Sequence, residues 1–349
     1  MQKPFPVLTR LYIYSKDGNV PVLPGGFFGG SAPCLQEIRL YGIPFPALST
    51  LLLSASDLVK LSLLGIPPTG YAGYISPEEI VASLAALPRL KVFAIEFQLA
   101  NSRPDRIHPP PITRTVLPVL TSFRFCGSSE YLEDLVAQID SPQLDQIEIK
   151  YFRRFLHFQV AQFSKFIDRS VGLKITPSRR AHVTFFSDEV SFNMYRHANH
   201  PSESWDQRSV AITISCKGIG RQVSQIARVL SHISVTLSVV HLYLDTYPQE
   251  YQLEGTDNVE WQHLLHQFST AQTLHVSRGL AWHFALALED ITGEMAAEVL
   301  PSLDLICLGD PPPSSVEKFV AVRRLSGRPI TVVGTWMEFD KRLKSYVSE

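Results

Sequence analysis

The stretch "SAPCLQEIRLYGIPF" (residues 31–45) places Leu35, Ile38 and Leu40 at a spacing of three and then two residues. This spacing is the period of neither a helix nor a simple strand. A short strand with one buried face explains Ile38 and Leu40, because alternate residues of a strand point to the same side. Leu35 then turns inward from the loop that approaches the strand. The segment therefore predicts a short strand preceded by an inward-pointing leucine.

The same spacing recurs along the chain, at first positions that step by 27, 23, 32, 30 and 24 residues from Leu8 to Leu144 and that resume at Leu237. A period near 30 residues with an L-x-x-L-x-L core is the sequence signature of a leucine-rich-repeat-like solenoid. Three buried aliphatic side chains contribute on the order of 5–8 kcal/mol, which cannot offset the ordering of a whole repeat. Neighbouring repeats must therefore stack and share one core. The first apolar positions are Leu8, Leu35, Leu58, Leu90, Leu120, Leu144, Leu237, Ala271 and Leu303.

Helical segments are predicted between the strands. In "SPEEIVASLAAL" (residues 76–87), Ser76 is a predicted N-cap, Pro77 occupies the first helical position, and Glu79 stands where a capping box requires it. Alternating strands and helices indicate parallel strands joined by right-handed crossovers. The predicted fold is thus an α/β leucine-rich-repeat-like solenoid, a curved parallel sheet with helices on its convex side. Further helices are expected over residues 129–139, 159–170, 220–230, 258–268 and 315–325.

The predicted domain organisation is a single solenoid over residues 1–349. Regular repeats are expected over 5–150 and again over 236–310, with a helix and a strand in 311–349. The middle, 151–235, is expected to be irregular, although "AHVTFF" and "SVAITIS" within it are strand-like. Two segments are predicted to lack regular structure, the polar stretch 184–208 and the proline-rich stretch 101–118, which is typical of a long bridging loop.

Composition limits the classes of partner. Lys and Arg total 32 against 33 Asp and Glu, so nucleic acid and anionic membranes are poor default partners. No apolar run is long enough for a membrane span, and no signal-peptide core is present near the N-terminus. The four cysteines are about 90 residues apart, without the short spacings of zinc sites or disulfide frameworks. We therefore expect a cytoplasmic or nuclear location.

The sequence resembles the leucine-rich-repeat portion of the F-box-like proteins of mushroom-forming fungi. The likeness is carried by "GGSAPCLQEIRLYGIPFPALSTLLLSASDLVKLSL", by "GYISPEEIVASLAALPRLKVFAIEFQ" and above all by "SRPDRIHPPPITRTVLPVLTSFRFCGSSEYLEDLVAQIDSPQLDQIEI". The resemblance implies a repeat domain that holds a target protein and that, in fuller members, is joined to an F-box that docks onto a ubiquitin-ligase adaptor. This chain begins in a repeat at Leu8, so an adaptor is an expected partner only if an F-box is supplied upstream. It is either a fragment of a longer product or an F-box-less relative.

Catalytic and ligand-binding motifs are weak, and the prediction is a non-enzyme with no cofactor and no metal. The His-x-x-His pairs at His197 and at His263 lack the spacing and companions of zinc sites. "GGFFGGS" (residues 25–31) lacks the Lys-Ser/Thr of a phosphate loop. The open enzymatic alternative is a (β/α)-barrel, whose period is also near 30 and whose catalytic groups lie at the C-terminal ends of strands. The residues at those positions are Glu96, Lys150, Asp245 and Asp310.

The residues that alternate with the inward positions are expected to project from the sheet, and they mix aromatic side chains with both signs of charge. Tyr and Arg are enriched at the energetic centres of protein interfaces. The favoured function is therefore a non-enzymatic protein-interaction scaffold that binds an unidentified protein on its concave face; an ordinary solvated face is the alternative. The predicted protein-binding residues are Tyr12, Tyr14, Glu37, Arg39, Tyr41, Glu96, Arg124, Glu148 and Lys150.

Overall fold

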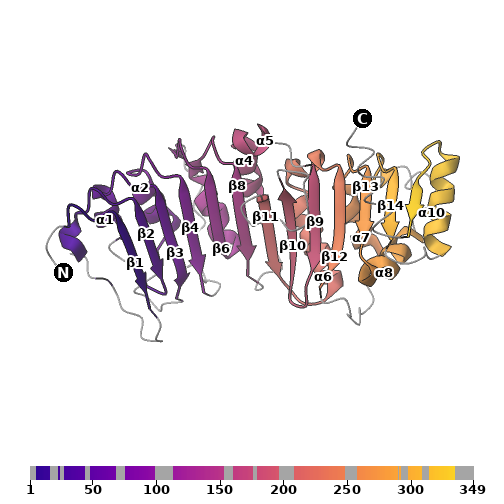
Figure 1. Cartoon of the computed structure of the whole chain (residues 1–349), viewed down its shortest axis with the longest axis horizontal. Coiled ribbons are helices and arrows are strands. Elements are labelled where there is room, and N and C mark those ends of the chain that lie inside the picture. The colour runs from indigo at the N-terminus through magenta and orange to yellow at the C-terminus, as the bar shows by residue number, and fades with distance from the viewer. Residues whose placement is uncertain are drawn as a thin grey trace. The chain divides into compact units, whose positions relative to one another are not determined.

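The computed structural model, whose helices and strands are labelled in Figure 1, divides into two compact units, an N-terminal unit (Met1–Thr176) and a C-terminal unit (Pro177–Glu349). Among the described residues, no helix combines the length and hydropathy needed to cross a membrane. The proline-rich stretch 101–112, His197 and Asp310 lie outside the described residues. The structure describes residues 5–15, 23, 27–43, 48–67, 75–98, 113–152, 160–175, 179–195, 208–247, 258–289, 291, 298–308 and 314–334.

The N-terminal unit is a parallel sheet in which neighbouring strands follow one another along the chain. A short second sheet pairs β5 (Thr115–Val116) with β7 (Ile139–Asp140). The strands of the main sheet of the N-terminal unit are β1 (Arg10–Tyr14), β2 (Glu37–Tyr41), β3 (Lys60–Ile66), β4 (Val92–Phe97), β6 (Ser122–Gly127) and β8 (Gln146–Tyr151). Its helices are η1 (Phe27–Gly30), α1 (Leu48–Ser54), α2 (Pro77–Leu84), α3 (Ser129–Ala137), α4 (Ala161–Arg169) and α5 (Val171–Ile175).

The three-plus-two spacing builds the core of this unit as predicted. Leu35, Ile38 and Leu40 are at most 1% exposed. The strand register aligns Ile38 with Leu11 on one side and Leu61 on the other, so each apolar position forms a row across the sheet. Because each inward residue packs between those of its neighbours, the core is continuous from repeat to repeat.

Helix α2 begins as the sequence predicts. The Ser76 hydroxyl accepts from the backbone N–H of Glu79, and the Glu79 carboxylate accepts from the N–H of Ser76. This reciprocal capping satisfies N–H groups that a helix start leaves unpaired.

Helix α4 is capped by a residue from the preceding repeat. Its own N-cap residue, Val160, has no side-chain acceptor. The Glu133 carboxylate, carried by α3, accepts from the backbone N–H groups of Gln162 and Phe163 at 2.7 and 2.9 Å. Glu133 is only 7% exposed, so a buried negative charge lies at the positive end of the α4 dipole. The two adjacent helices are joined by a polar contact as well as by apolar packing.

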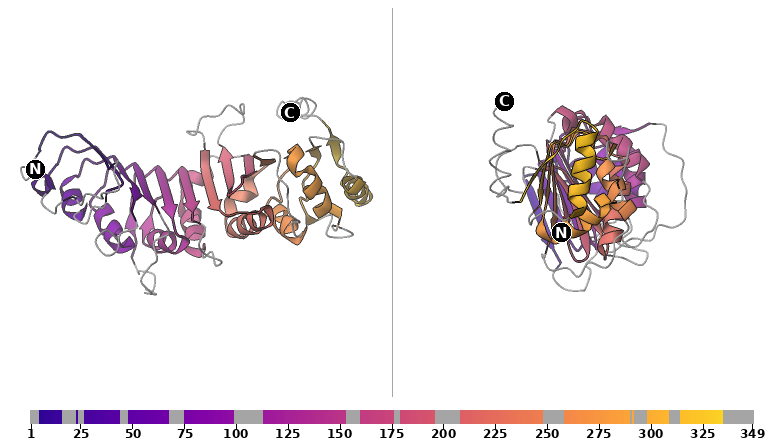
Figure 2. Two further views of the ribbon diagram at one scale, coloured as in Figure 1. Left: turned by 90° about the horizontal axis from the view of Figure 1, so that it is seen from below. Right: turned by 90° about the vertical axis from the view of Figure 1, so that its right-hand side faces the viewer.

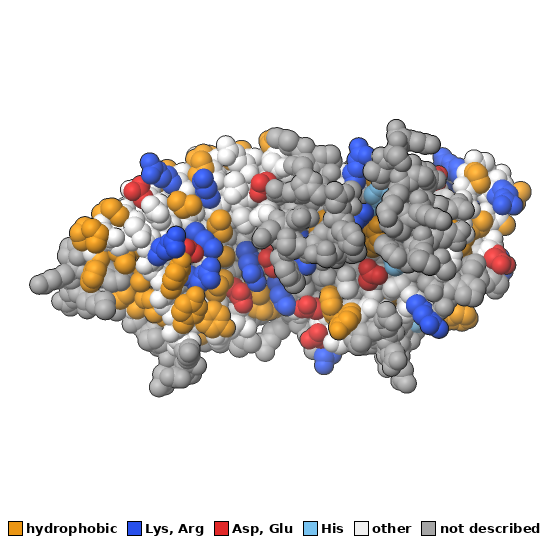
Figure 3. Space-filling model, viewed as in Figure 1, with side chains coloured by type: hydrophobic (Ala, Val, Ile, Leu, Met, Phe, Trp, Pro, Cys, Tyr) orange, Lys and Arg blue, Asp and Glu red, His pale blue; other side chains and the backbone are white. Residues whose placement is uncertain are grey.

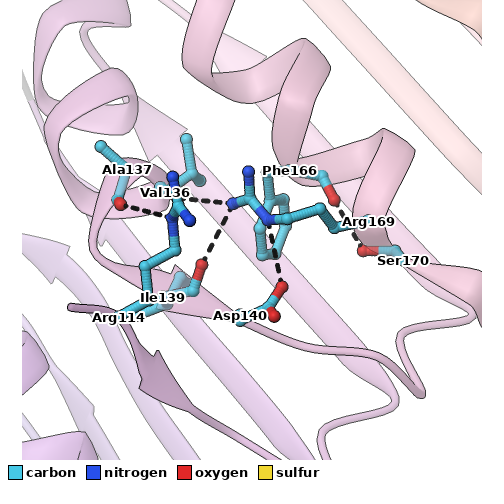
Figure 4. A network of polar contacts seen from close by, with 8 residues as sticks. All are labelled: Arg114, Val136, Ala137, Ile139, Asp140, Phe166, Arg169 and Ser170. Atoms are coloured by element: carbon cyan, nitrogen blue, oxygen red, sulfur yellow. Dashed lines mark hydrogen bonds and ion pairs between the residues drawn. The ribbon is translucent and has the colours of Figure 1, made fainter. Parts of the chain in front are cut away.

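Two arginines contact the C-terminal end of α3 and the strand after it: Arg169, at the end of α4, and Arg114, just before β5 (Figure 4). Arg169 forms an ion pair with Asp140 at 3.1 Å and also donates to the carbonyls of Val136 and Ile139. Arg114 donates to the carbonyl of Ala137 at 3.1 Å. The last carbonyls of a helix have no partner within it, so these cations satisfy acceptors and complement the negative helix end.

The C-terminal unit also combines strands with helices, but its strands are not all parallel. The order of its sheet is β11-β10-β9-β12-β13-β14-β15, with β10 antiparallel to both of its neighbours. Its strands are β9 (Arg180–Phe185), β10 (Glu189–Tyr195), β11 (Arg208–Ser215), β12 (His241–Thr246), β13 (Thr273–Val276), β14 (Leu305–Leu308) and β15 (Thr331–Val333). Its helices are α6 (Ile219–Leu230), η3 (Ser234–Ser238), α7 (Asn258–His266), α8 (Arg278–Glu289) and α10 (Ser314–Leu325).

The prediction that residues 184–208 are irregular is wrong for β10. Val190, Phe192 and Met194 alternate with polar residues and are at most 2% exposed. The turn from β9 is closed by a bond from the N–H of Phe186 to the carbonyl of Glu189. Since so short a turn leaves no room for a crossover helix, β10 returns antiparallel to β9. The strand has the period of two without the preceding leucine, so the repeat pattern does not include it.

The predicted fold class, an α/β leucine-rich-repeat-like solenoid, is confirmed. In each unit the helices cover one face of the sheet (Figure 2). The barrel alternative is wrong: within the described part of the chain, β1 pairs only with β2 and β15 only with β14, whereas a barrel requires a closed ring. The single solenoid over residues 1–349 stays a prediction.

Candidate functional site

The predicted binding residues lie on the face of the N-terminal sheet that the helices leave uncovered, and we call this surface the outward face. They occupy rows set by the strand register, with Tyr12 aligned to Arg39 and Arg124 aligned to Glu148. Acidic, basic and apolar side chains are interspersed over these strands (Figure 3). The sequence prediction and the structure thus agree on which side of each strand these residues occupy.

Glu37 is the centre of the first group on this face. Its carboxylate accepts a short hydrogen bond from the Tyr12 hydroxyl and lies 3.7 Å from the Arg39 guanidinium. The Lys60 ammonium approaches the same carboxylate at 3.4 Å. The Arg39 guanidinium also lies 5.7 Å from the centroid of the Tyr12 ring, within the range of a cation-π contact. These contacts from β1, β2 and β3 hold the group in one arrangement without a helix or loop.

The charges of this group follow from those contacts. The hydrogen bond from Tyr12, together with the nearby Lys60 and Arg39, lowers the pKa of Glu37 below its ordinary value of 4.5. The same bond raises the pKa of Tyr12, because the phenol must stay protonated to donate to a carboxylate. At neutral pH Glu37 is therefore an anion and Tyr12 is neutral. The two cations beside the carboxylate, Arg39 and Lys60, leave this group with a net positive charge.

The tyrosines form an exposed apolar surface beside Glu37. Tyr14 and Tyr41 have ring centroids 6.3 Å apart, and they are 54% and 44% exposed, while Tyr12 is 47% exposed. The Tyr41 ring lies over Gly65 of β3, where an added Cβ would come within 3.3 Å of the ring. Gly65 also has a positive φ of 58° and lies where the register of β3 to β4 shifts, so its lack of a side chain permits this backbone conformation and leaves space for the ring.

The other predicted residues form a second group rather than extending the first. Arg124 and Glu148 lie 3.7 Å apart on β6 and β8. Glu96 and Lys150 align with Cys126 on either side of it. Cys126 is 6% exposed, and burial followed by the charge of Glu96 raises its pKa to about 12, which keeps the thiol protonated.

Small, buried residues separate the two groups. In the row that runs from Arg39 to Arg124, the intervening positions are Ser62 and Ala94, which are 4% and 7% exposed. The structure therefore brings together Tyr12, Tyr14, Glu37, Arg39 and Tyr41, and separately Glu96, Arg124, Glu148 and Lys150.

Lys60 is a member of the first group that the sequence prediction missed. Its register position, opposite Glu37 at the start of β3, makes the contact. The signal was present in "DLVKLSL", where Lys60 stands one residue before the inward Leu61, as Glu37 stands before Ile38.

The C-terminal unit carries a second polar and aromatic cluster on its own sheet. His182 stacks on Tyr243 with centroids 4.4 Å apart, and Asp245 lies 3.7 Å from His182 and 3.9 Å from His275. Burial is the largest influence on His275 and lowers its pKa, although Asp245 opposes this shift. These residues come from β9, β12 and β13, and their proximity depends on β9 pairing with β12, which the repeat spacing did not predict.

No group of histidine, cysteine and carboxylate side chains among the described residues could hold a metal ion. Of the positions named for the barrel alternative, Glu96 and Lys150 flank the protonated Cys126, and Asp245 contacts the two histidines.

Comparison with known proteins finds similarity among solved structures. No protein-family model matches the chain, and no curated protein matches it. A solved structure to which it is similar is the leucine-rich repeat-containing protein LegL7 from Legionella pneumophila, with 15% sequence identity, 88% coverage of each chain and a TM-score of 0.33.

Proposed function

We propose that the protein is a non-enzymatic interaction scaffold that binds a protein partner on the outward face of its N-terminal unit, with Tyr12, Tyr14, Arg39 and Tyr41 as the main contacts. The observation that carries the proposal is the exposure of these three tyrosines on the sheet, each more than two-fifths exposed, with Arg39 over the ring of Tyr12. Large amphipathic side chains that are already ordered lose little conformational entropy on binding, which is why Tyr and Arg dominate interface energetics. Glu96, Arg124, Glu148 and Lys150 would form a polar periphery.

The experiment uses a photo-crosslinking amino acid at position 12, with the same amino acid at Arg89 as the control. Arg89 is exposed and lies in the loop before β4, outside the strands that carry the outward face, where it pairs with Asp57. A partner that crosslinks at position 12 and not at position 89 is then purified. The double variant Tyr12→Ala with Arg39→Ala should weaken its binding by about 10-fold or more, while Arg89→Ala should leave it unchanged. Equal affinity of both variants would remove this face from consideration.

The resemblance to F-box-like proteins supports a narrower role, as the target-recognition domain of a ubiquitin-ligase receptor acting in the cytoplasm or nucleus. In this role the ligase adaptor would bind an F-box supplied upstream of the repeats, and the outward face would hold the target. The test is to join an F-box in frame before the repeats and to measure ubiquitin transfer to the crosslinked partner. Transfer that requires both the F-box and Tyr12 with Arg39 supports the role, and transfer that is indifferent to those two side chains contradicts it.

A further inference from the structure

Strand β1 is an edge strand of the N-terminal sheet. It pairs with β2 on one side and with no strand of the described chain on the other. The Thr9 carbonyl accepts from the N–H of Glu37, and the Ser15 N–H donates to the carbonyl of Tyr41. Since successive residues of a strand direct their backbone groups to opposite sides, the N–H and C=O groups of Arg10, Tyr12 and Tyr14 point away from β2. These groups form a hydrogen-bonding edge in register with the first group on the outward face.

The core beneath this edge is less covered than in the next repeat. Leu11 and Ile13 of β1 are part-exposed, whereas Ile38 and Leu40, their register partners in β2, are at most 1% exposed. Ahead of the strand, Val7 is 84% exposed and Phe5 is 38% exposed. Each stacked layer buries its neighbour, so an added strand with apolar residues on this side would complete the layer at β1.

The outward side of the same edge is basic. Arg10 is exposed and lies opposite Glu37 in the strand register, and Arg39 and Lys60 both contact the Glu37 carboxylate, which already accepts from Tyr12. A second copy of this chain would bring the same cations to its own edge, and like charges opposed across a strand pair are destabilising. An extended segment with acidic residues on one face and apolar residues on the other matches both sides of β1.

We propose that β1 binds an extended, alternating acidic and apolar segment of a partner protein by strand addition, with backbone hydrogen bonds to Arg10, Tyr12 and Tyr14. This proposal rests on the proposed function and specifies its mode of binding. In such recognition the backbone bonds give affinity, and the alternate side chains give specificity. Acidic side chains of the segment would face Arg10 and Arg39, and its apolar side chains would cover Leu11 and Ile13.

The probe is a fluorescein-labelled peptide EVEIEVE, with KVKIKVK as the reversed-charge control, measured by fluorescence anisotropy on the full chain. We expect EVEIEVE to bind with a Kd of about 0.1 mM or tighter, and KVKIKVK not to bind. Arg10→Ala removes the charge but keeps the backbone donor, and should weaken binding about fivefold. Arg10→Pro also removes the donor on the free edge without touching the bonds to β2, and should weaken binding further. Lys91→Ala, at an exposed cation outside the strands, should have no effect.

Two peptides with N-methyl groups test the backbone bonds directly, one methylated at the glutamates and the other at the apolar residues. Only one set of amides can face β1, so one peptide should bind and the other should not. Equal binding by both methylated peptides, or no saturable binding by EVEIEVE, would overturn strand addition by such a segment. A dimer of the chain that Arg10→Pro dissociates would also overturn it, because a second copy would then occupy the edge of β1. If the crosslinked partner is weakened by Tyr12→Ala with Arg39→Ala but not by Arg10→Pro, the proposed function stands and this mode of binding fails.

Discussion

Removing the carboxylate of Glu133 should destabilise the N-terminal unit, because this carboxylate caps helix α4. The helix has no capping side chain at its own N-cap residue, Val160. The variant Glu133→Ala loses two charge-assisted hydrogen bonds, to the N–H groups of Gln162 and Phe163. Loss of an N-cap costs about 1 kcal/mol, and a hydrogen bond to a charged group contributes about 1.5–3 kcal/mol. The relief of a buried charge offsets part of this loss. We expect the free energy of unfolding to fall by about 2–3 kcal/mol.

The assay is urea denaturation followed by circular dichroism, with hydrogen exchange at the amides of Gln162 and Phe163 as a local measurement. Glu133→Gln keeps one acceptor and should lose about half as much stability as Glu133→Ala. Glu130→Ala, in the first turn of the same helix, is the matched control and should change stability by no more than about 0.5–1 kcal/mol. Unchanged exchange at both amides in Glu133→Ala, with an unfolding midpoint like that of the control, would refute the capping role.

Further predictions concern the core, the histidines and the arginine cluster. Ile38→Asp buries an unpaired charge in the shared core and should lower stability by more than about 4 kcal/mol, whereas Val7→Asp, at a site 84% exposed, should leave the thermal midpoint nearly unchanged. His241 has its pKa lowered from 6.5 to about 4, mainly by burial, so the unfolded chain takes up its proton first as the pH falls. Stability should therefore drop by up to about 3 kcal/mol between pH 6.5 and 4, and His241→Gln should reduce this slope in a pH series of urea midpoints. Arg169→Ala should cost about 1–3 kcal/mol by thermal denaturation, since it removes the ion pair with Asp140 and the donor to the carbonyls of Val136 and Ile139; a loss no larger than that of Arg89→Ala would contradict this.

The parts of the fold that depend on local spacing could be predicted from the sequence. The strand and its buried positions could be predicted from the spacing of Leu35, Ile38 and Leu40, because side-chain direction follows the backbone period. The cap at Ser76 could be predicted for the same reason, since both partners lie within one turn. Strand β10 could not, because the repeat pattern includes a leucine three residues ahead of each strand, whereas an antiparallel return needs only a short turn.

Contacts that depend on strand register or on a neighbouring repeat could not be predicted from the sequence. Each repeat has its own length, so the residue of α3 that reaches the start of α4 cannot be identified by spacing, and Glu133 gave no signal. The side of each strand on which the binding residues lie was predictable from alternation. Their division into two groups was not, because it depends on Ser62 and Ala94 being small and buried in the row between.

The antiparallel β9-β10-β11 segment has a consequence for how the C-terminal unit folds. Parallel repeats require a crossover before two strands can meet, which makes their pairing slow. Strands β9 and β10 are joined by a short turn, and hairpins of this kind form in about 1–10 μs. This segment therefore supplies a local starting point onto which the parallel strands β12 to β15 can add in sequence. Mutations in its turn should slow refolding, whereas equally destabilising mutations in β14 should mainly accelerate unfolding.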